Sequence, residues 1–390
     1  MIYRQAEEIL AETLAPLTTG EFFGAVGKRS LDLRGGPAHP RGKLFGDDPK
    51  RTLLNAFRTH ATTLESHARA PTQAAPEPRA VSSANEMLEL VKDFHARGYT
   101  VRVPHVTSLA PGVRQFTRAL EFMLRRPAKA AMVWGAAGAE AIIHYDKPDN
   151  IIVQLEGRKR WFISTDPPGL QNKWTQVGEP LPDLTRHRIV DVEPGDLIYV
   201  PHGTPHTVES TTESLHLAIV FEPLSLKDAI IAAVDRLADS DRTFRETAMT
   251  RVQDADLGHV SSQVLEGLER LMAHCRSEDF LKEAIDLRAS RSTAEMAALP
   301  KPSAMVGVTP DTRVRQSPLA ICYLRPSFDS LDFSQPGEHI SIHRGVEPEL
   351  QFIASTDSFR VGDVPGASSV DVKAALVSRL IQSGFLEIAD

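Results

Sequence analysis

The sequence predicts a protein of mixed α and β structure, in which a small β-barrel or sandwich is flanked by helices. Residues 130–221 break into short apolar runs separated by Gly and Pro, which is typical of barrels and sandwiches. Residues 1–17 and 224–298 instead carry apolar side chains at helical spacing. With 390 residues, the chain is long enough for two or three domains and an ample core.

Composition excludes several classes of protein. A hydrophobic content of 42% and a charged content of 24% are ordinary for a globular protein. The net charge of −7 argues against a general nucleic-acid binder and suits a basic partner. Cys275 and Cys322 are too few for a disulfide framework or a structural zinc site. Because no secretory signal and no membrane-length apolar run appears, we expect a cytoplasmic protein without membrane segments.

The N-terminal third alternates helices with short strands. We expect helices over 1–17, from 18–23 onward, over 47–64 and over 86–97, and strands over 28–34 and 99–103. Gly98 is a typical residue to follow a helix end, and residues 68–85, rich in Ala, Pro and Ser, form a linker. A further helix, with apolar residues from Val113 to Leu124, precedes the barrel.

The barrel strands are expected over 151–155, 159–164, 197–200 and 214–221, with a turn at Gly157. Residues 174–189, of mixed polarity, are expected to form loops over the barrel mouth.

The C-terminal part is predicted to contain a helical block and then a mixed tail. Two apolar stripes run through the block, one of Ile230, Val234 and Leu237 and one of Val264, Leu268 and Leu271. The tail, from 301, has short strands, one helix that begins near Ser368 and ends at Gly384, and a closing strand.

The stretch from His144 to His206 carries the chemistry. His144 and Asp146 are expected at the start of a strand, where alternate side chains share a face. A later histidine, either His202 or His206, would complete two imidazoles and one carboxylate, the set that holds Fe(II) with positions left open. Taken alone, a His-x-Asp is more often a surface pair, so the motif depends on its context.

That context is a basic strand and a Pro-Gly-Asp turn. Arg158, Lys159 and Arg160 could each bind an anion, and strand alternation places Lys159 and Trp161 opposite the two arginines. A solvated basic strand is the alternative, and it is preferred for the arginines. The run 193–206, Glu-Pro-Gly-Asp-Leu-Ile-Tyr-Val-Pro-His-Gly-Thr-Pro-His, leads into the candidate third ligand.

Together these segments resemble the JmjC-type cupin oxygenases, which use Fe(II) and 2-oxoglutarate, and within them the compact ribosomal-protein hydroxylases (ribosomal oxygenases). The resemblance implies a double-stranded β-helix (cupin/JmjC) core. It implies four parts: an N-terminal lead-in and linker (1–85), a catalytic domain (86–223), a helical dimerisation region (224–300) and a winged-helix-like domain (301–390). The last has 8 Lys and Arg against 11 Asp and Glu. We therefore expect a packing or protein-contact domain and no direct DNA binding.

The resemblance also implies roles for single residues. His206 becomes the third metal ligand beside His144 and Asp146, and Lys159 the base that binds the far carboxylate of 2-oxoglutarate. Asn150 and His216 are further candidates for the cofactor site. Where some relatives place a hydroxyl that helps to hold this carboxylate, the chain has Ala141.

The implied activity is hydroxylation of a side chain of a ribosomal protein by a homodimer. Two alternatives stay open. One is a hydroxylase of a small molecule or free amino acid. The other is a catalytically silent cupin that binds a partner or senses a ligand, although the presence of all three ligands and Lys159 weighs against it.

Overall fold

The structure is a computed structural model that describes residues 2–30, 32–35, 40–166, 184–249, 256–303, 307–326 and 329–389. It divides into two compact units. The first comprises residues 1–123 and 127–222, and the second comprises residues 124–126 and 223–390. Each unit is described by itself below.

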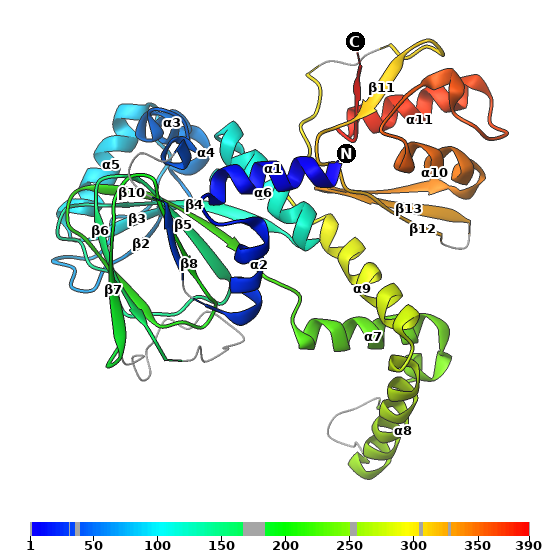
Figure 1. Ribbon diagram of the computed structural model, residues 1–390, viewed down its shortest axis with the longest axis horizontal. Coiled ribbons are helices and arrows are strands. Elements are labelled where there is room, and N and C mark those ends of the chain that lie inside the picture. The colour runs from blue at the N-terminus through cyan, green and yellow to red at the C-terminus, as the bar shows by residue number, and fades with distance from the viewer. Residues whose placement is uncertain are drawn as a thin grey trace. The chain divides into compact units, whose positions relative to one another are not determined.

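The first unit is built around two antiparallel sheets that face each other (Figure 1). The larger sheet has the strand order β1-β8-β5-β10-β4-β3-β2, and the smaller has the order β7-β6-β9. Their bounds are β1 Asp32–Gly35, β2 Glu65–His67, β3 Thr100–Val103, β4 Ala128–Gly135, β5 Asp149–Glu156, β6 Lys159–Ser164, β7 His187–Val192, β8 Asp196–Val200, β9 His206–Ser210 and β10 Ser214–Phe221. One cluster of buried side chains includes Ile152 of the larger sheet and Trp161 of the smaller, so the core lies between the sheets. The expected barrel is confirmed.

Strand β6 sets the register of the smaller sheet. It pairs with β9 so that Lys159 lies opposite Ser210 and Ile163 lies opposite His206. Directly opposite residues of an antiparallel pair point to the same face. Lys159 and Trp161 are buried while Arg160 is exposed, as strand alternation predicts. The strand begins after Gly157, which has a φ of +65°. A Cβ added at this position would lie only 2.0 Å from the Glu213 carbonyl oxygen, so only glycine fits here.

The N-terminal helices follow the prediction, except that the helix expected over 47–64 is divided into two short helices. They are α1 Ile2–Leu14, α2 Thr19–Lys28, α3 Pro49–Asn55, α4 Phe57–His60, α5 Ala84–Ala96 and α6 Pro111–Leu124. Helix α2 begins with a capping box, in which Thr18 and Glu21 satisfy each other's backbone N–H groups. Gly98, with φ +86°, follows α5 as expected. The strand expected over 28–34 is shorter, because α2 extends to Lys28 and β1 begins at Asp32.

Three expectations for the barrel need correction. His144 and Asp146 lie in a connection outside the named strands, where His144 forms an isolated bridge with His206. Strand β9, which begins at His206, was not expected. Of the loops expected over 174–189, residues 174–183 lie outside the described residues, and 187–189 belong to β7.

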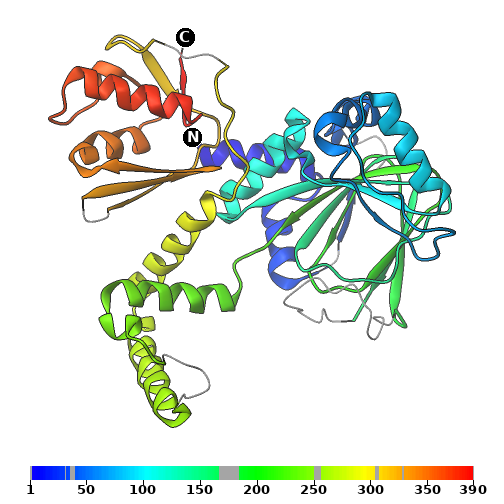
Figure 2. The same cartoon turned by 180° about the vertical axis from the view of Figure 1, so that it is seen from behind.

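The second unit opens with the helices α7 Leu226–Ser240, α8 Leu257–Cys275 and α9 Glu278–Thr293, which form the green to yellow part of the ribbon (Figures 1 and 2). Leu237 and Leu271 are buried in the shared core of these helices. Val264 and Leu268 are exposed. Each of the two predicted apolar stripes is therefore buried at one end, at Leu237 and at Leu271, by packing between the helices.

The tail has two three-stranded sheets and two helices around one core. The sheets are β15-β11-β16 and β12-β13-β14, with bounds β11 Arg313–Gln316, β12 Tyr323–Pro326, β13 Ser330–Gln335, β14 Glu338–His343, β15 Ser358–Arg360 and β16 Leu386–Ile388. Helix α11 (Val370–Gln382) is the expected helix, capped by Ser369. Helix α10 (Glu347–Ser355) was missed by the sequence analysis. Within the described residues, no helix is long and apolar enough to cross a membrane.

Candidate metal centre

Three side chains from separate parts of the chain converge at one end of the barrel interior. His144 and Asp146 come from the connection before β5, and His206 is the first residue of β9. One potential ligand atom from each lies within 4.8 Å of the other two. Two imidazoles and a carboxylate so arranged are the facial set of non-haem Fe(II) sites.

The backbone holds these three residues together. His144 N–H donates to the His206 carbonyl at 3.0 Å, and His206 N–H donates to the His144 carbonyl at 2.8 Å. Gly203 N–H, in the turn before His206, donates to the Asp146 carbonyl at 2.8 Å. The ligand geometry therefore comes from hydrogen bonds between distant segments, and not from alternation along one strand.

Both imidazoles are oriented for metal binding. The Nδ1 of His144 lies 2.8 Å from the Ile142 carbonyl, and the Nδ1 of His206 lies 2.9 Å from the Thr204 carbonyl. Because a carbonyl only accepts, each Nδ1 must carry the proton, which leaves each Nε2 as a lone-pair donor. Burial and the nearby His144 lower the pKa of His206, which keeps this imidazole neutral. The donor set thus fits a divalent metal such as Fe(II).

The structure separates the two histidines that competed for the third position. His202 donates its backbone N–H to Asp149 at 2.8 Å, and its Nδ1 lies 3.4 Å from the same carboxylate oxygen. Tyr199 also donates to this oxygen, at 3.1 Å. Among the described residues, the metal-ligating cluster contains His206 and not His202. Asn150 lies beside the cluster and donates its amide N–H to the Asp146 carboxylate at 3.3 Å.

A buried cation lies further along β6. Lys159 is 1% exposed, and burial lowers its pKa to about 7 from the ordinary value of 10.5. Arg160 and Arg158 are on the outer face, where they pair with Asp191 and Glu193. Burying a lysine without a carboxylate is costly, so its position favours an anionic ligand that enters the barrel.

Buried polar atoms without a described partner surround the same space. His216 lies on β10, with its ring centroid 5.6 Å from that of Trp161, and burial followed by the charge of Lys159 holds the pKa of His216 well below its usual range. Within the part of the chain that the structure describes, such atoms include Asn150 Oδ1, Gln154 Oε1, Trp161 Nε1, Thr204 Oγ1 and His216 Nδ1. Because buried polar groups are normally hydrogen-bonded, these atoms indicate a site made for a polar ligand.

A further histidine, His67, belongs to none of the motifs in the sequence. This residue ends β2, opposite Thr100 of β3. Burial, followed by the charges of His144 and Lys159, lowers the pKa of His67 to about 4. Its place near the cofactor space depends on the pairing of β2 with β3, and a lone histidine beside a predicted linker carries no signal of it.

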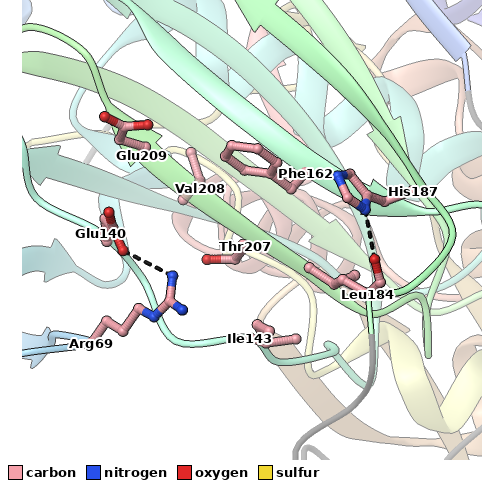
Figure 3. A pocket seen from close by; sticks show the side chains of 9 residues that line it. All are labelled: Arg69, Glu140, Ile143, Phe162, Leu184, His187, Thr207, Val208 and Glu209. Carbon is pink, nitrogen blue, oxygen red and sulfur yellow. Dashed lines mark hydrogen bonds and ion pairs between the residues drawn. The ribbon is translucent and has the colours of Figure 1, made fainter.

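A surface pocket of about 250 Å³ lies on the other side of β6 and β9 (Figure 3). The β-strand residues Phe162, Thr207 and Glu209 line it, and these alternate with the inward-facing residues. At one side, Arg69 donates to the Glu140 carboxylate at 2.9 Å. The pocket is therefore separate from the space that contains Lys159.

Comparison with known proteins identifies the domain that contains this site. Residues 113–229 match the model of the JmjC domain. The chain carries a JmjC domain. This domain contains His144, Asp146 and His206, the ligand set of JmjC-type Fe(II)- and 2-oxoglutarate-dependent oxygenases.

Three relatives of this JmjC protein differ in how much of each chain is matched. It is 26% identical over 267 residues to the uncharacterized protein YxbC of Bacillus subtilis. This alignment covers 62% of this chain and 79% of YxbC. It is 28% identical over 180 residues to ribosomal oxygenase 2 of Rattus norvegicus. This alignment covers 43% of this chain and 37% of that protein. The match to the bifunctional lysine-specific demethylase and histidyl-hydroxylase NO66 of Drosophila erecta, 28% identical over 155 residues, covers 37% of this chain and only 21% of NO66.

The fold is also that of a solved structure. Escherichia coli ribosomal oxygenase YcfD superposes on the JmjC protein with a TM-score of 0.52, 15% identity, and coverage of 96% of this chain and 98% of YcfD. At this identity the likeness establishes the fold alone.

Proposed function

We propose that this JmjC oxygenase hydroxylates a side chain (Arg, His or Asn) of a protein, and that the protein is a ribosomal one. The support is the likeness to proteins named ribosomal oxygenases, in sequence over part of the chain and in fold over nearly all of it. Of these observations, the sequence match to ribosomal oxygenase 2 carries the proposal, and the shared fold is consistent with it.

The triad and its neighbours divide the work at the metal. His144, Asp146 and His206 hold Fe(II), which with bound 2-oxoglutarate supplies the oxidation of an unactivated C–H bond by dioxygen. The carbonyls of Ile142 and Thr204 keep the two imidazole rings in the ligating tautomer. Asn150 orients the Asp146 carboxylate through its amide N–H.

Lys159 binds the far carboxylate of 2-oxoglutarate. Its ammonium is buried, and the orphaned Nδ1 of His216 lies in the same interior. A charge-assisted hydrogen bond from Lys159 compensates for the burial of both charges. His216 completes the cofactor site, because its buried Nδ1 needs a partner that the described residues do not supply.

A basic protein segment suits the charge of this chain. With a net charge of −7, the protein attracts a basic ribosomal segment at long range, and salt screens this attraction. The test measures 2-oxoglutarate turnover with ribosomal-protein peptides at low and at high salt. We expect stimulation by a peptide, stronger at low salt, and a one-oxygen mass increase of that peptide. His206→Ala serves as the matched inactive control.

Two other outcomes would replace the substrate proposal. If free Arg, free His or a metabolite stimulates turnover while peptides do not, the enzyme is a small-molecule hydroxylase. If 2-oxoglutarate is not consumed with any of them after Fe(II) is added, the protein is a binding or sensing cupin.

We also propose that the helical region forms a homodimer. Four apolar side chains lie along one side of α8 at intervals of seven, four and four residues, and all are about half exposed or more: Leu257, Val264, Leu268 and Met272. A second copy of the same helix would cover this face symmetrically.

We further propose that the tail is a winged-helix-like contact domain. We also propose that the protein acts in the cytoplasm, in keeping with its two free cysteines.

A further inference from the structure

The indole N–H of Trp161 is a buried donor without an acceptor among the described residues. Trp161 is 3% exposed and lies on the inner face of β6. Lys159 and Ile163 lie on the same face of the strand as Trp161, and Ile163 is paired with His206 of β9. A buried N–H with no partner costs free energy, so its position calls for a ligand.

The indole lies between the metal ligands and the buried lysine. Its ring centroid is 5.7 Å from that of His206 and 5.6 Å from that of His216. Along β6, Trp161 is two residues from Lys159, and both side chains point into the barrel. A molecule that reaches from the metal to Lys159 would therefore lie close to the indole.

Such a molecule can supply the missing acceptor. The hydrophobic side chains in the same buried cluster as Trp161 include Ala141, Ile152 and Val208, which have no side-chain acceptor. Three buried oxygen atoms among the described residues, Asn150 Oδ1, Gln154 Oε1 and Thr204 Oγ1, also have no partner, so none of them accepts from the indole. Lys159, buried in the same interior, adds an ammonium donor. A carboxylate, with about four acceptor sites on two oxygens, can be shared by several donors.

We propose that Trp161 is a cofactor-binding residue, and that its indole N–H donates to the far carboxylate of 2-oxoglutarate alongside Lys159. This supplies a second partner for that carboxylate in a chain that has Ala141, without a hydroxyl, in the same buried cluster. The inference extends the proposed role of Lys159 and is independent of the substrate.

The test measures binding, without turnover, to protein loaded with Mn(II) in the absence of oxygen. Titration calorimetry with 2-oxoglutarate compares wild type with Trp161→Phe, which keeps an aromatic ring and removes the N–H. We expect an affinity about tenfold or more weaker, the effect of losing a hydrogen bond to a charged group. With 2-oxobutyrate, which has the same metal-binding end and no far carboxylate, wild type and variant should bind alike.

Two controls separate the N–H from packing. Trp134→Phe removes an indole N–H that already donates to Glu213 at 2.9 Å, and it should leave 2-oxoglutarate affinity unchanged. Site-specific benzothienylalanine at position 161 keeps the shape of the indole with sulfur in place of N–H, and it should reproduce the loss. Unchanged 2-oxoglutarate binding in this analogue would overturn the inference, as would an equal loss for 2-oxobutyrate. A failure of Lys159 substitution to weaken 2-oxoglutarate would instead overturn the proposed role of Lys159.

Discussion

His144 and His206, 62 positions apart, exchange two backbone hydrogen bonds, of 3.0 and 2.8 Å. Each residue thus fixes the other's backbone, and each imidazole Nδ1 is fixed by a carbonyl two residues earlier. The Nε2 atoms are left for the metal. Because both hydrogen bonds are formed by backbone atoms, replacing one ligand side chain should leave the backbone position of the other ligand unchanged.

For this reason, His144→Ala, Asp146→Ala and His206→Ala are each expected to abolish Fe(II)-dependent 2-oxoglutarate turnover with little change in folding. Turnover is followed by succinate formation, and folding by thermal unfolding of the metal-free protein. His202→Ala is the matched control, since His202 contacts Asp149 and not the cluster, and it should keep most of the activity. An active His206→Ala together with an inactive His202→Ala would contradict the ligand assignment.

Lys159→Met is expected to weaken 2-oxoglutarate binding and to stabilise the cofactor-free protein. Loss of the charge-assisted bond, worth roughly 1.5–3 kcal/mol, corresponds to an affinity about ten- to a hundredfold lower, with metal binding kept. Lys159 has a folded-state pKa of about 7, below its ordinary value of 10.5. The unfolded chain therefore binds the proton more tightly, and at pH 7 the buried lysine destabilises the fold by an amount on the order of a few kcal/mol.

The gain in the free energy of unfolding for Lys159→Met should be largest at or below pH 7 and should shrink as the pH approaches 10.5. Denaturant unfolding at several pH values measures it. A variant that loses stability at neutral pH, in parallel with its loss of affinity, would show that Lys159 has a structural role instead.

The same pKa predicts how cofactor affinity depends on pH. The protonated lysine binds the carboxylate, and in the free protein it loses its proton as the pH rises through about 7. The apparent affinity for 2-oxoglutarate should therefore fall between pH 7 and pH 9, by at most about tenfold per pH unit. Titration calorimetry of the Mn(II) protein measures this fall and the accompanying proton uptake. In Lys159→Arg the slope should vanish, because arginine stays charged; a slope retained in this variant would assign the titration to another group.

The dimer proposal predicts that Val264→Glu with Leu268→Glu produces a folded monomer, because both side chains are about half exposed on one side of α8. Leu237→Glu should instead destabilise the helical region, since Leu237 is 1% exposed within its core. Light scattering gives the mass at micromolar concentration. A monomeric wild type would refute the dimer.

Some of this molecule is determined by local sequence alone. The inward direction of Lys159 and the outward direction of Arg160 follow from strand alternation, which needs only the period of a strand. The helix ends at Thr18 and Gly98 follow from capping chemistry and positive φ. The resemblance of the motifs likewise identified the metal triad.

Other features were decided only by tertiary structure, because they depend on which distant segments pair. The expected strand through His144 is a bridge to His206, which no local pattern encodes. His67 lies near Lys159 only because β2 pairs with β3, and Leu237 is internal only because α8 and α9 cover it. The unpaired indole N–H of Trp161 is likewise invisible in the sequence, since a missing partner is a property of everything packed around a side chain.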